Sequence, residues 1–148
     1  MSNIESVCQN RKARFEYSIE DTLEAGIVLT GTEIKSVRNH GVSLDGSYAR
    51  VDDGEVWLID SNIAEYTEGN SFNHDPKRKR KLLLHRKEIS KFADTAAQQG
   101  FALIPLSMYL KDGIAKIELA IAKGKKQHDK RQALKEKDAK REIREAGG

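Results

Sequence analysis

The stretch GKKQHDKR, residues 124–131, contains the densest group of side chains able to take part in chemistry. Its residue types suit a phosphate-binding loop, a catalytic His128-Asp129 pair, a basic targeting signal or an arm that binds nucleic acid. A Walker loop needs a glycine five positions before its Gly-Lys pair and a serine or threonine directly after it. Leu119 and Lys126 occupy those positions, so the stretch is not a Walker loop.

The spacing of the histidines supports neither an acid–base site nor a metal site. His74-Asp75 and His128-Asp129 are adjacent pairs, and adjacent side chains seldom point toward each other. No nucleophile follows either pair at a recognisable spacing. The four histidines lack the spacing of zinc ligands, and the chain has one cysteine. We therefore expect no enzymatic activity, no metal and no other cofactor.

Positive charge gathers in three clusters along the chain. One cluster is 123–131, within a segment, 123–145, that holds ten Lys and Arg against five Asp and Glu, whereas the remainder of the chain has 16 basic and 18 acidic residues. The other two clusters are RKAR at 11–14 and KRKRK at 77–81. Local charge density determines how strongly a phosphate backbone is attracted, so the predicted partner is a nucleic acid. For 77–81, a solvated surface without a partner is the alternative interpretation.

The kind of nucleic acid follows from how these clusters are placed. They flank apolar segments, and a folded domain with basic clusters on its rim can follow the backbone of structured RNA. The chain has only four Phe, four Tyr and one Trp, and Trp57 and Phe101 have the setting of core residues. Stacking on single-stranded bases is therefore the less favoured mode of binding.

Length and cysteine content limit the class of protein. A chain of 148 residues is expected to form one domain. The single cysteine, Cys8, excludes an intramolecular disulfide, so no oxidising compartment is required. No window approaches about 18 consecutive apolar residues, and the N-terminus has no apolar run of signal-peptide length. We expect a cytoplasmic protein that has no membrane partner.

The first half of the chain predicts strands around one short helix. Residues 1–14 read as a polar arm that leads into a strand beginning at FEYSI. EAGIVLTG, residues 24–31, is apolar and β-branched and predicts a buried strand. TEIKSVRNHG then predicts a helix that Thr32 caps and Gly41 ends.

Two hairpins and a second helix are predicted farther along. Strands at 47–52 and 55–60 are joined by Asp53-Gly54, and FALIPLSMYL and IAKIELAIA flank KDG at 111–113. Pro105 marks an edge strand or a bulge. Between the hairpins, residues 64–75 and the KRKRK run precede a helix, which carries Ile89, Phe92, Ala93 and Ala96 and ends at Gly100.

These elements predict a mainly β fold, an antiparallel barrel of about six strands with two to three helices, over residues 1–123. Residues 124–148 have few and small apolar side chains but a high helix propensity. We expect this basic tail to be disordered alone and helical when a polyanionic partner neutralises it.

Glu24 stands out as an acidic residue that enters an apolar strand. One interpretation is a carboxylate at a strand edge that limits aggregation. The other is an acceptor for hydrogen bonds from the amino or imino group of a base.

The order and spacing of six motifs resemble the small protein B (SmpB) family of SsrA-binding proteins. The motifs are NRKARFEY, EAGIVLTGTEIKSVR, DGEVWLI, FNHDPKRKRKLLLHRKEI, AKGKKQHDKR and KEKDAKREI, between residues 10 and 144. The resemblance implies an oligonucleotide-binding-type barrel that binds the tRNA-like part of transfer-messenger RNA. It also implies delivery of that RNA to stalled ribosomes for trans-translation, one monomer per RNA, without enzymatic activity.

The resemblance also implies which residues contact RNA. The family's motif positions match Asn10, Glu24, Leu83 and Lys116. Basic residues of the same motifs complete the expected surface for the tRNA-like RNA: Arg11, Lys12, Arg14, Lys35, Arg38, Arg78 and Lys81. Contacts with the decoding centre and the mRNA channel of the ribosome are expected from Gly124, Lys125, Lys126, His128, Asp129, Lys130 and Arg131.

Two other function classes use the same features. A structural protein of the ribosome could bind ribosomal RNA through the same basic rim and tail. A nuclease that uses His128 with Asp129 is a more distant alternative.

Overall fold

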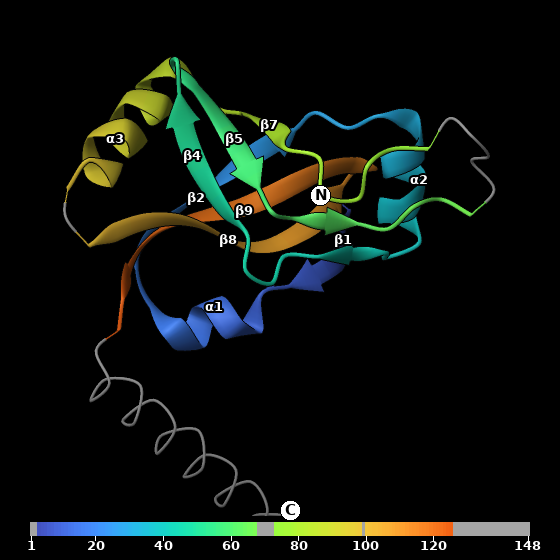
Figure 1. Ribbon diagram of the computed structural model, residues 1–148, viewed down its shortest axis with the longest axis horizontal. Helices are drawn as coiled ribbons and strands as arrows, with labels where there is room; N and C mark the ends of the chain where they lie inside the picture. The colour runs from blue at the N-terminus through green and yellow to red at the C-terminus, as the bar shows by residue number, and fades with distance from the viewer. Residues whose placement is uncertain (1–2, 68–72, 99, 126–148) are drawn as a thin grey trace, which may run out of the picture.

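The computed structural model describes residues 3–67, 73–98 and 100–125 (Figure 1). Across these ranges the chain forms nine strands and three helices. In chain order they are β1 (Ile4–Gln9), α1 (Arg11–Glu16), β2 (Tyr17–Ile27), α2 (Gly31–Arg38), β3 (Val42–Ser43), β4 (Tyr48–Asp52), β5 (Glu55–Ile59), β6 (Asn62–Ile63), β7 (Arg80–Leu83), α3 (Arg86–Ala96), β8 (Phe101–Lys111) and β9 (Ile114–Gly124).

Six of the strands form a closed ring. Their order is β8-β4-β5-β7-β2-β9, and β9 pairs again with β8. Strand β1 joins the other edge of β8 beside β4, while β3 and β6 form a separate short ladder. Helices α2 and α3 lie at opposite ends of the ring (Figure 1). The predicted mainly β fold of about six strands with two to three helices is confirmed.

Both predicted hairpins are present, and their turns explain why the sequence identified them. Asp53 and Gly54 have φ of 51° and 75°, and Asp112 and Gly113 have φ of 51° and 82°. Two consecutive residues with positive φ make the tight turn whose twist matches that of paired strands. The pairing therefore starts immediately, with Asp52 opposite Glu55 in the first hairpin.

Pro105 lies at a bulge in β8, where the register with β9 shifts between Pro105 and Ser107. The alternative of an edge strand is wrong, because β8 pairs with β9 along one side and with β1 and β4 along the other. The bulge relaxes the ladder at the residue that cannot donate a backbone hydrogen bond.

The core fills the ring and continues beneath α1. Large aliphatic side chains such as Leu58, Leu82 and Leu119 are fully buried in the ring. On the opposite face of β8 and β9, a second cluster packs Ala13 of α1 against Leu106. Strand β8 is therefore buried on both faces over residues 103–108. A continuous apolar run is typical of such a doubly covered strand.

The N-terminal segment differs from the prediction. Residues 4–9 are not a free arm but form β1, which pairs with β8 and buries Val7. Phe15 and Glu16 belong to α1 instead of starting a strand. Asn10 determines this turn of helix, because its side chain accepts a hydrogen bond from the Ala13 amide and caps the helix.

Two further boundaries also differ. The cap of α2 is Thr30, not Thr32, because Glu33 completes a capping box by accepting a hydrogen bond from the Thr30 amide at 2.8 Å. The second basic cluster is not all loop: Arg80 and Lys81 begin β7, which pairs with both β5 and β2.

A buried ion pair ties α2 to β7. Arg80 and Glu33 are both fully buried, and their side chains meet at 2.6 Å. Arg80 also donates to the Ser61 hydroxyl at 3.0 Å and to two backbone carbonyls, Asp75 and Pro76. Each nitrogen of this guanidinium therefore donates to an acceptor, as a buried charge requires.

Glu33 stays ionised inside the protein. Burial favours its neutral form, but hydrogen bonds from Arg78, the Thr30 amide and Arg80 outweigh burial and lower the pKa to about 2. The unperturbed value is 4.5. Because the folded pKa is the lower one, the stabilisation is complete above pH 4.5 and is lost as the pH falls toward 2.

We predict that Glu33→Gln lowers the free energy of unfolding by about 3–5 kcal/mol at neutral pH, because Arg80 stays buried without a counter-charge. Urea unfolding followed by circular dichroism measures this loss. The difference between the wild type and the variant should shrink as the pH falls from 4.5 toward 2, where Glu33 itself becomes protonated.

The matched control is Glu55→Gln, which removes the partner of Lys81 in a pair whose side chains are 45% and 39% exposed. This change should cost about 1 kcal/mol or less. Equal losses for the two variants would contradict a structural role for the buried pair.

Candidate nucleic-acid interface

Glu24, Leu83 and Lys116 meet on the outer face of the sheet formed by β7, β2 and β9. They line a hollow of about 340 Å³ together with Gly26 and His85. The register places Gly26 of β2 opposite Leu83 on one side and opposite Lys116 on the other. A Cβ at Gly26 would lie 3.2 Å from the Leu83 Cβ, so the glycine makes room for this exposed leucine.

Glu24 is held in place by neighbours from β8. The Tyr109 hydroxyl donates a short hydrogen bond to one carboxylate oxygen, and Lys111 Nζ lies 3.5 Å from the other. The hydrogen bond from Tyr109 is the main cause that lowers the pKa of Glu24, with Lys111 and Lys116 adding to it. Burial and the same hydrogen bond raise the pKa of Tyr109. This face thus presents a fixed anion, an apolar side chain and a cation side by side.

The first basic cluster lies on α1. Arg11, Lys12 and Arg14 are exposed, and Arg14 lies 3.7 Å from Glu118 of β9. Asn10 is different, because it is 2% exposed and its Nδ2 donates to the carbonyls of Leu44 and Pro105. The structure therefore places Asn10 inside, where it orients the helix that carries the cations.

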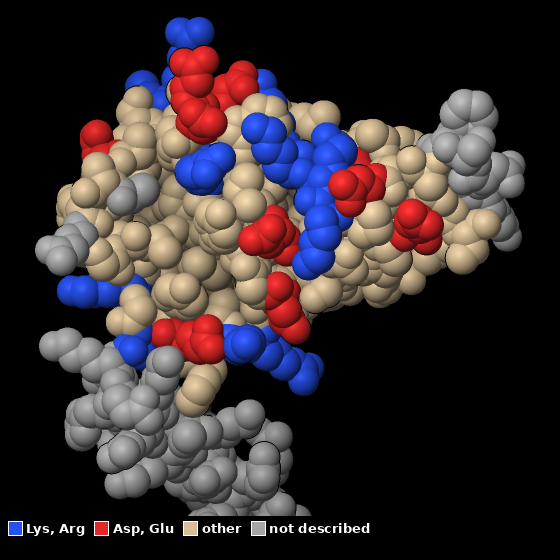
Figure 2. All heavy atoms as spheres, in the orientation of Figure 1, with Lys and Arg blue, Asp and Glu red and all other residues tan. Residues whose placement is uncertain are grey.

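The second basic cluster is divided among several partners. Arg80 is buried, so the solvated-surface interpretation is wrong for that residue. Arg78 donates to Glu33 at 2.6 Å, and Lys81 to Glu55 at 2.9 Å. The Lys79 ammonium lies 4.6 Å from the centre of the Trp57 ring. Figure 2 shows that Lys and Arg groups on this face lie close to Asp and Glu groups.

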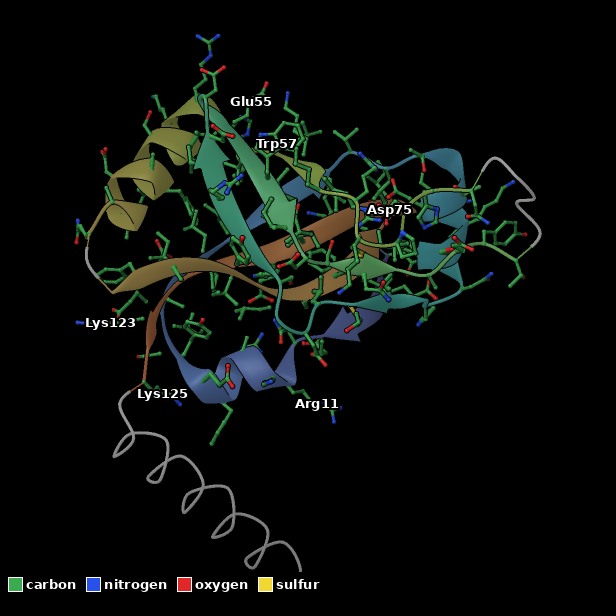
Figure 3. All side chains as sticks on the ribbon, viewed as in Figure 1. Arg11, Glu55, Trp57, Asp75, Lys123 and Lys125 are labelled. Carbon is green, nitrogen blue, oxygen red and sulfur yellow. The ribbon has the colours of Figure 1, made fainter. Side chains whose placement is uncertain are left out.

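Trp57 does not have the core setting that its sequence context suggested, since Val56 and Leu58 on either side point inward. Its ring is available to Lys79 because alternate residues of a strand face opposite ways. Figure 3 labels Glu55 and Trp57 on the opposite side of the molecule from α1.

The cations of α2 form a separate group. Lys35 and Arg38 are exposed, and the Lys35 ammonium lies 5.4 Å from the centre of the Tyr66 ring. His74 beneath them is buried and hydrogen-bonded to the Thr32 hydroxyl and the Ile63 carbonyl. His74 is therefore a structural residue.

The exit toward the C-terminus lies beside α1. Gly124 pairs with Tyr17, and the Lys125 amide donates to the Glu16 carbonyl at 2.9 Å. Figure 3 labels Arg11 at one end of α1 and Lys125 near the other. The other expected tail contacts, Lys126, His128, Asp129, Lys130 and Arg131, lie outside the described residues, as do residues 68–72 of the turn-like polar segment 64–75.

Sequence reasoning missed Tyr109 and Lys111. The KDG turn predicted the hairpin of β8 and β9 but not its register, which places Tyr109 opposite Lys116. No local pattern predicted that β9 also pairs with β2, which brings Glu24 to the same face.

Within the described ranges, no group of three or more His, Cys, Asp or Glu residues is placed to hold a metal ion. Nor is any helix in that part of the chain long and apolar enough to cross a membrane.

Comparison with known proteins decides the family. The family model described as SmpB protein matches residues 7–147. The chain belongs to the SmpB family. Curated relatives named SsrA-binding protein include those of Bacillus cereus (59% identical) and Listeria monocytogenes (56%), each over 140 residues and 95% of this chain. The matches cover 90% and 91% of those relatives.

A solved SmpB structure supports the same fold. The chain described as "tmRNA-SmpB: a journey to the center of the bacterial ribosome" is 44% identical, with a TM-score of 0.69. The match covers 86% of this chain and 93% of that one.

We predict that Tyr109→Phe raises the pKa of Glu24, because the variant keeps the ring but loses the hydroxyl that favours the carboxylate form. Carbon-13 NMR titration of the carboxyl group measures the change. Tyr48→Phe is the control, since no hydrogen bond joins Tyr48 to Glu24. A Glu24 pKa that stays the same in Tyr109→Phe would contradict the assigned hydrogen bond.

Proposed function

We propose that this protein binds transfer-messenger RNA (SsrA RNA) and works with it on stalled ribosomes in trans-translation. The observation that carries the proposal is membership of the SmpB family, whose relatives at 56–59% identity are named SsrA-binding protein. The solved neighbour, described as tmRNA-SmpB in the bacterial ribosome, supports the same pair of partners. The protein brings the tRNA-like RNA to the ribosome so that the nascent peptide is tagged and released.

The hollow at Glu24 supplies three kinds of RNA contact. Ionised Glu24 accepts hydrogen bonds from the N–H groups of an exposed base. A surface that binds only phosphates could not tell one base from another. Leu83 packs against the apolar part of that nucleotide, and Lys116 pairs with a phosphate. The hydrogen bond from Tyr109 holds the carboxylate in place on this face.

The remaining cations contact phosphates around this centre or on the ribosome. We include Arg78 because Glu33 fixes its guanidinium while 36% of its side chain stays exposed. Asn10 contributes indirectly, by capping α1 and so placing its cations. The other proposed phosphate contacts are Arg11, Lys12, Arg14, Lys35, Arg38 and Lys81.

The C-terminal residues provide the second half of the function. We propose that residues 1–123 bind transfer-messenger RNA and that the basic tail, 124–148, enters the ribosome and becomes helical there. Gly124 and Lys125 start this segment at the end of β9. Lys126, His128, Asp129, Lys130 and Arg131 would contact the decoding centre and the mRNA channel.

This function requires binding and positioning, and we propose no catalytic step for the protein itself. One monomer acts per RNA, in the cytoplasm, where ribosomes translate. A structural ribosomal protein remains the second candidate, because scattered cations with acidic partners would also suit a stable contact with ribosomal RNA.

We predict that Glu24→Gln weakens binding of the tRNA-like RNA by about tenfold or more, because hydrogen bonds to a charged acceptor contribute about 1.5–3 kcal/mol. Filter binding measures the affinity, with tRNA and a ribosomal RNA fragment as competitors. Glu20→Gln is the matched control, since Glu20 is exposed on the same strand. Equal affinity for all three RNAs would favour the structural ribosomal protein.

We also predict that deleting residues 126–148 leaves the affinity for the tRNA-like RNA within about threefold but abolishes peptide tagging, because the two parts meet different RNAs. Filter binding and a reconstituted translation assay on a truncated message measure the two effects. A loss of affinity as large as that of Glu24→Gln would contradict this division of the chain. The threefold limit allows for the few phosphate contacts that the basic tail adds at physiological salt.

A further inference from the structure

A second, larger hollow lies between α1, β4, α3 and the start of β8. Its volume is about 650 Å³, within the range of about 300–1,000 Å³ that is usual for sites of small ligands. Three aromatic side chains line it, Tyr17, Tyr48 and Phe101, together with Lys12 and Arg50. Of the residues given a role in RNA binding above, only Asn10 and Lys12 are part of its described lining.

The aromatic residues form two fixed walls and one exposed wall. Tyr17 is half-buried against the small apolar cluster beneath α1, and Phe101 is half-buried against the main core. Tyr48 is 37% exposed. Rings held by packing lose little conformational freedom when a flat ligand binds between them.

The charged residues of this hollow favour an anionic ligand. Lys12 and Arg50 are exposed and form no ion pair among the residues described here. The Lys123 ammonium lies 5.8 Å from the centre of the ring of Phe101, which is one of the lining residues. Glu16 is the single acidic residue in the described lining.

This hollow is separate from the Glu24 surface. Tyr17 and Glu24 are seven positions apart on β2, which corresponds to about 23 Å along a strand. Glu24 lines the hollow that contains Leu83 and Lys116, whereas Tyr17 lines the other hollow beside residues of α1. One nucleotide cannot reach both.

We propose that the second hollow binds one unpaired nucleotide, with its base stacked on the exposed Tyr48 ring inside the lining that also contains Tyr17 and Phe101. Its phosphates lie against Lys12 and Arg50. Every base has a flat face that stacks on an aromatic ring, and an unpaired nucleotide combines that face with adjacent negative charge. The proposal rests on the RNA-binding function proposed above and adds a second point of contact to it.

A direct test uses the full-length protein and a fluorescent uridine pentanucleotide, with binding followed by anisotropy. Tyr48→Ala should weaken binding about tenfold, since stacking on one aromatic ring contributes about 1–3 kcal/mol. Tyr48→Phe keeps the ring and should bind like the wild type. Glu20→Gln changes an exposed residue that lines neither hollow and should also bind the pentanucleotide like the wild type.

A second variant tests the proposal in case Tyr48→Ala does not fold. Arg50→Gln leaves the aromatic walls in place and should reduce the slope of log affinity against log salt by about 0.7, the value for one phosphate contact on a single strand. The thermal midpoint of each variant is measured alongside. Wild-type affinity in Tyr48→Ala, or an unchanged salt slope in Arg50→Gln, would overturn the proposal.

The nucleotide has two possible sources, transfer-messenger RNA and ribosomal RNA. Ultraviolet cross-linking of the assembled ribosome complex, followed by mass spectrometry, should join a nucleotide to the peptide that contains Tyr48. The sequence of the attached RNA identifies its source. Cross-links at the Glu24 surface without any at Tyr48 would refute the second site and leave the proposed function intact. Cross-links at Tyr48 without any at the Glu24 surface would support the second site and contradict the contact proposed for Glu24.

Discussion

The buried ion pair between Glu33 and Arg80 determines where β7 lies, and the ring depends on β7. This strand is the link between β5 and β2, so without it the ring would be open. A buried guanidinium tolerates few positions, because each displaced donor loses a hydrogen bond that water cannot replace. The same pair also orients its surroundings: Glu33 binds Arg78 on the surface, and Leu83, three residues after Arg80, emerges beside Glu24. A core interaction therefore arranges part of the outer face.

The sequence predicted what is decided locally. The Asp-Gly turns specify both hairpins, because few residues accept two consecutive positive φ angles. It did not predict β1, whose polar residues lie along β8, or β7, whose KRKRK run looks solvated although Arg80 is buried. Those outcomes depend on distant partners. Glu24, Leu83 and Lys116 were expected from the family resemblance, and their meeting on one face needs the register of three strands. Tyr109 was missed for the same reason.

The number of aromatic residues indicated the capacity to stack on bases less well than their positions in the fold do. Nine aromatic residues in 148 suggested little stacking on bases, yet three of them line one hollow, and Trp57 holds a lysine on the surface. Strand alternation explains this, because inward neighbours such as Val56 and Leu58 fill the core without Trp57. The protein thus has two dissimilar concave surfaces near the two ends of β2. One is built around an anion, and the other around flat rings.

The hydrogen bond from the Lys125 amide to the Glu16 carbonyl joins the last described residue to the end of α1. The chain therefore does not leave the sheet as a free hinge, because its departure is clamped to a helix that carries three cations. The position of α1, with its three cations, and the position of the end of β9 are in this way linked through a single peptide group.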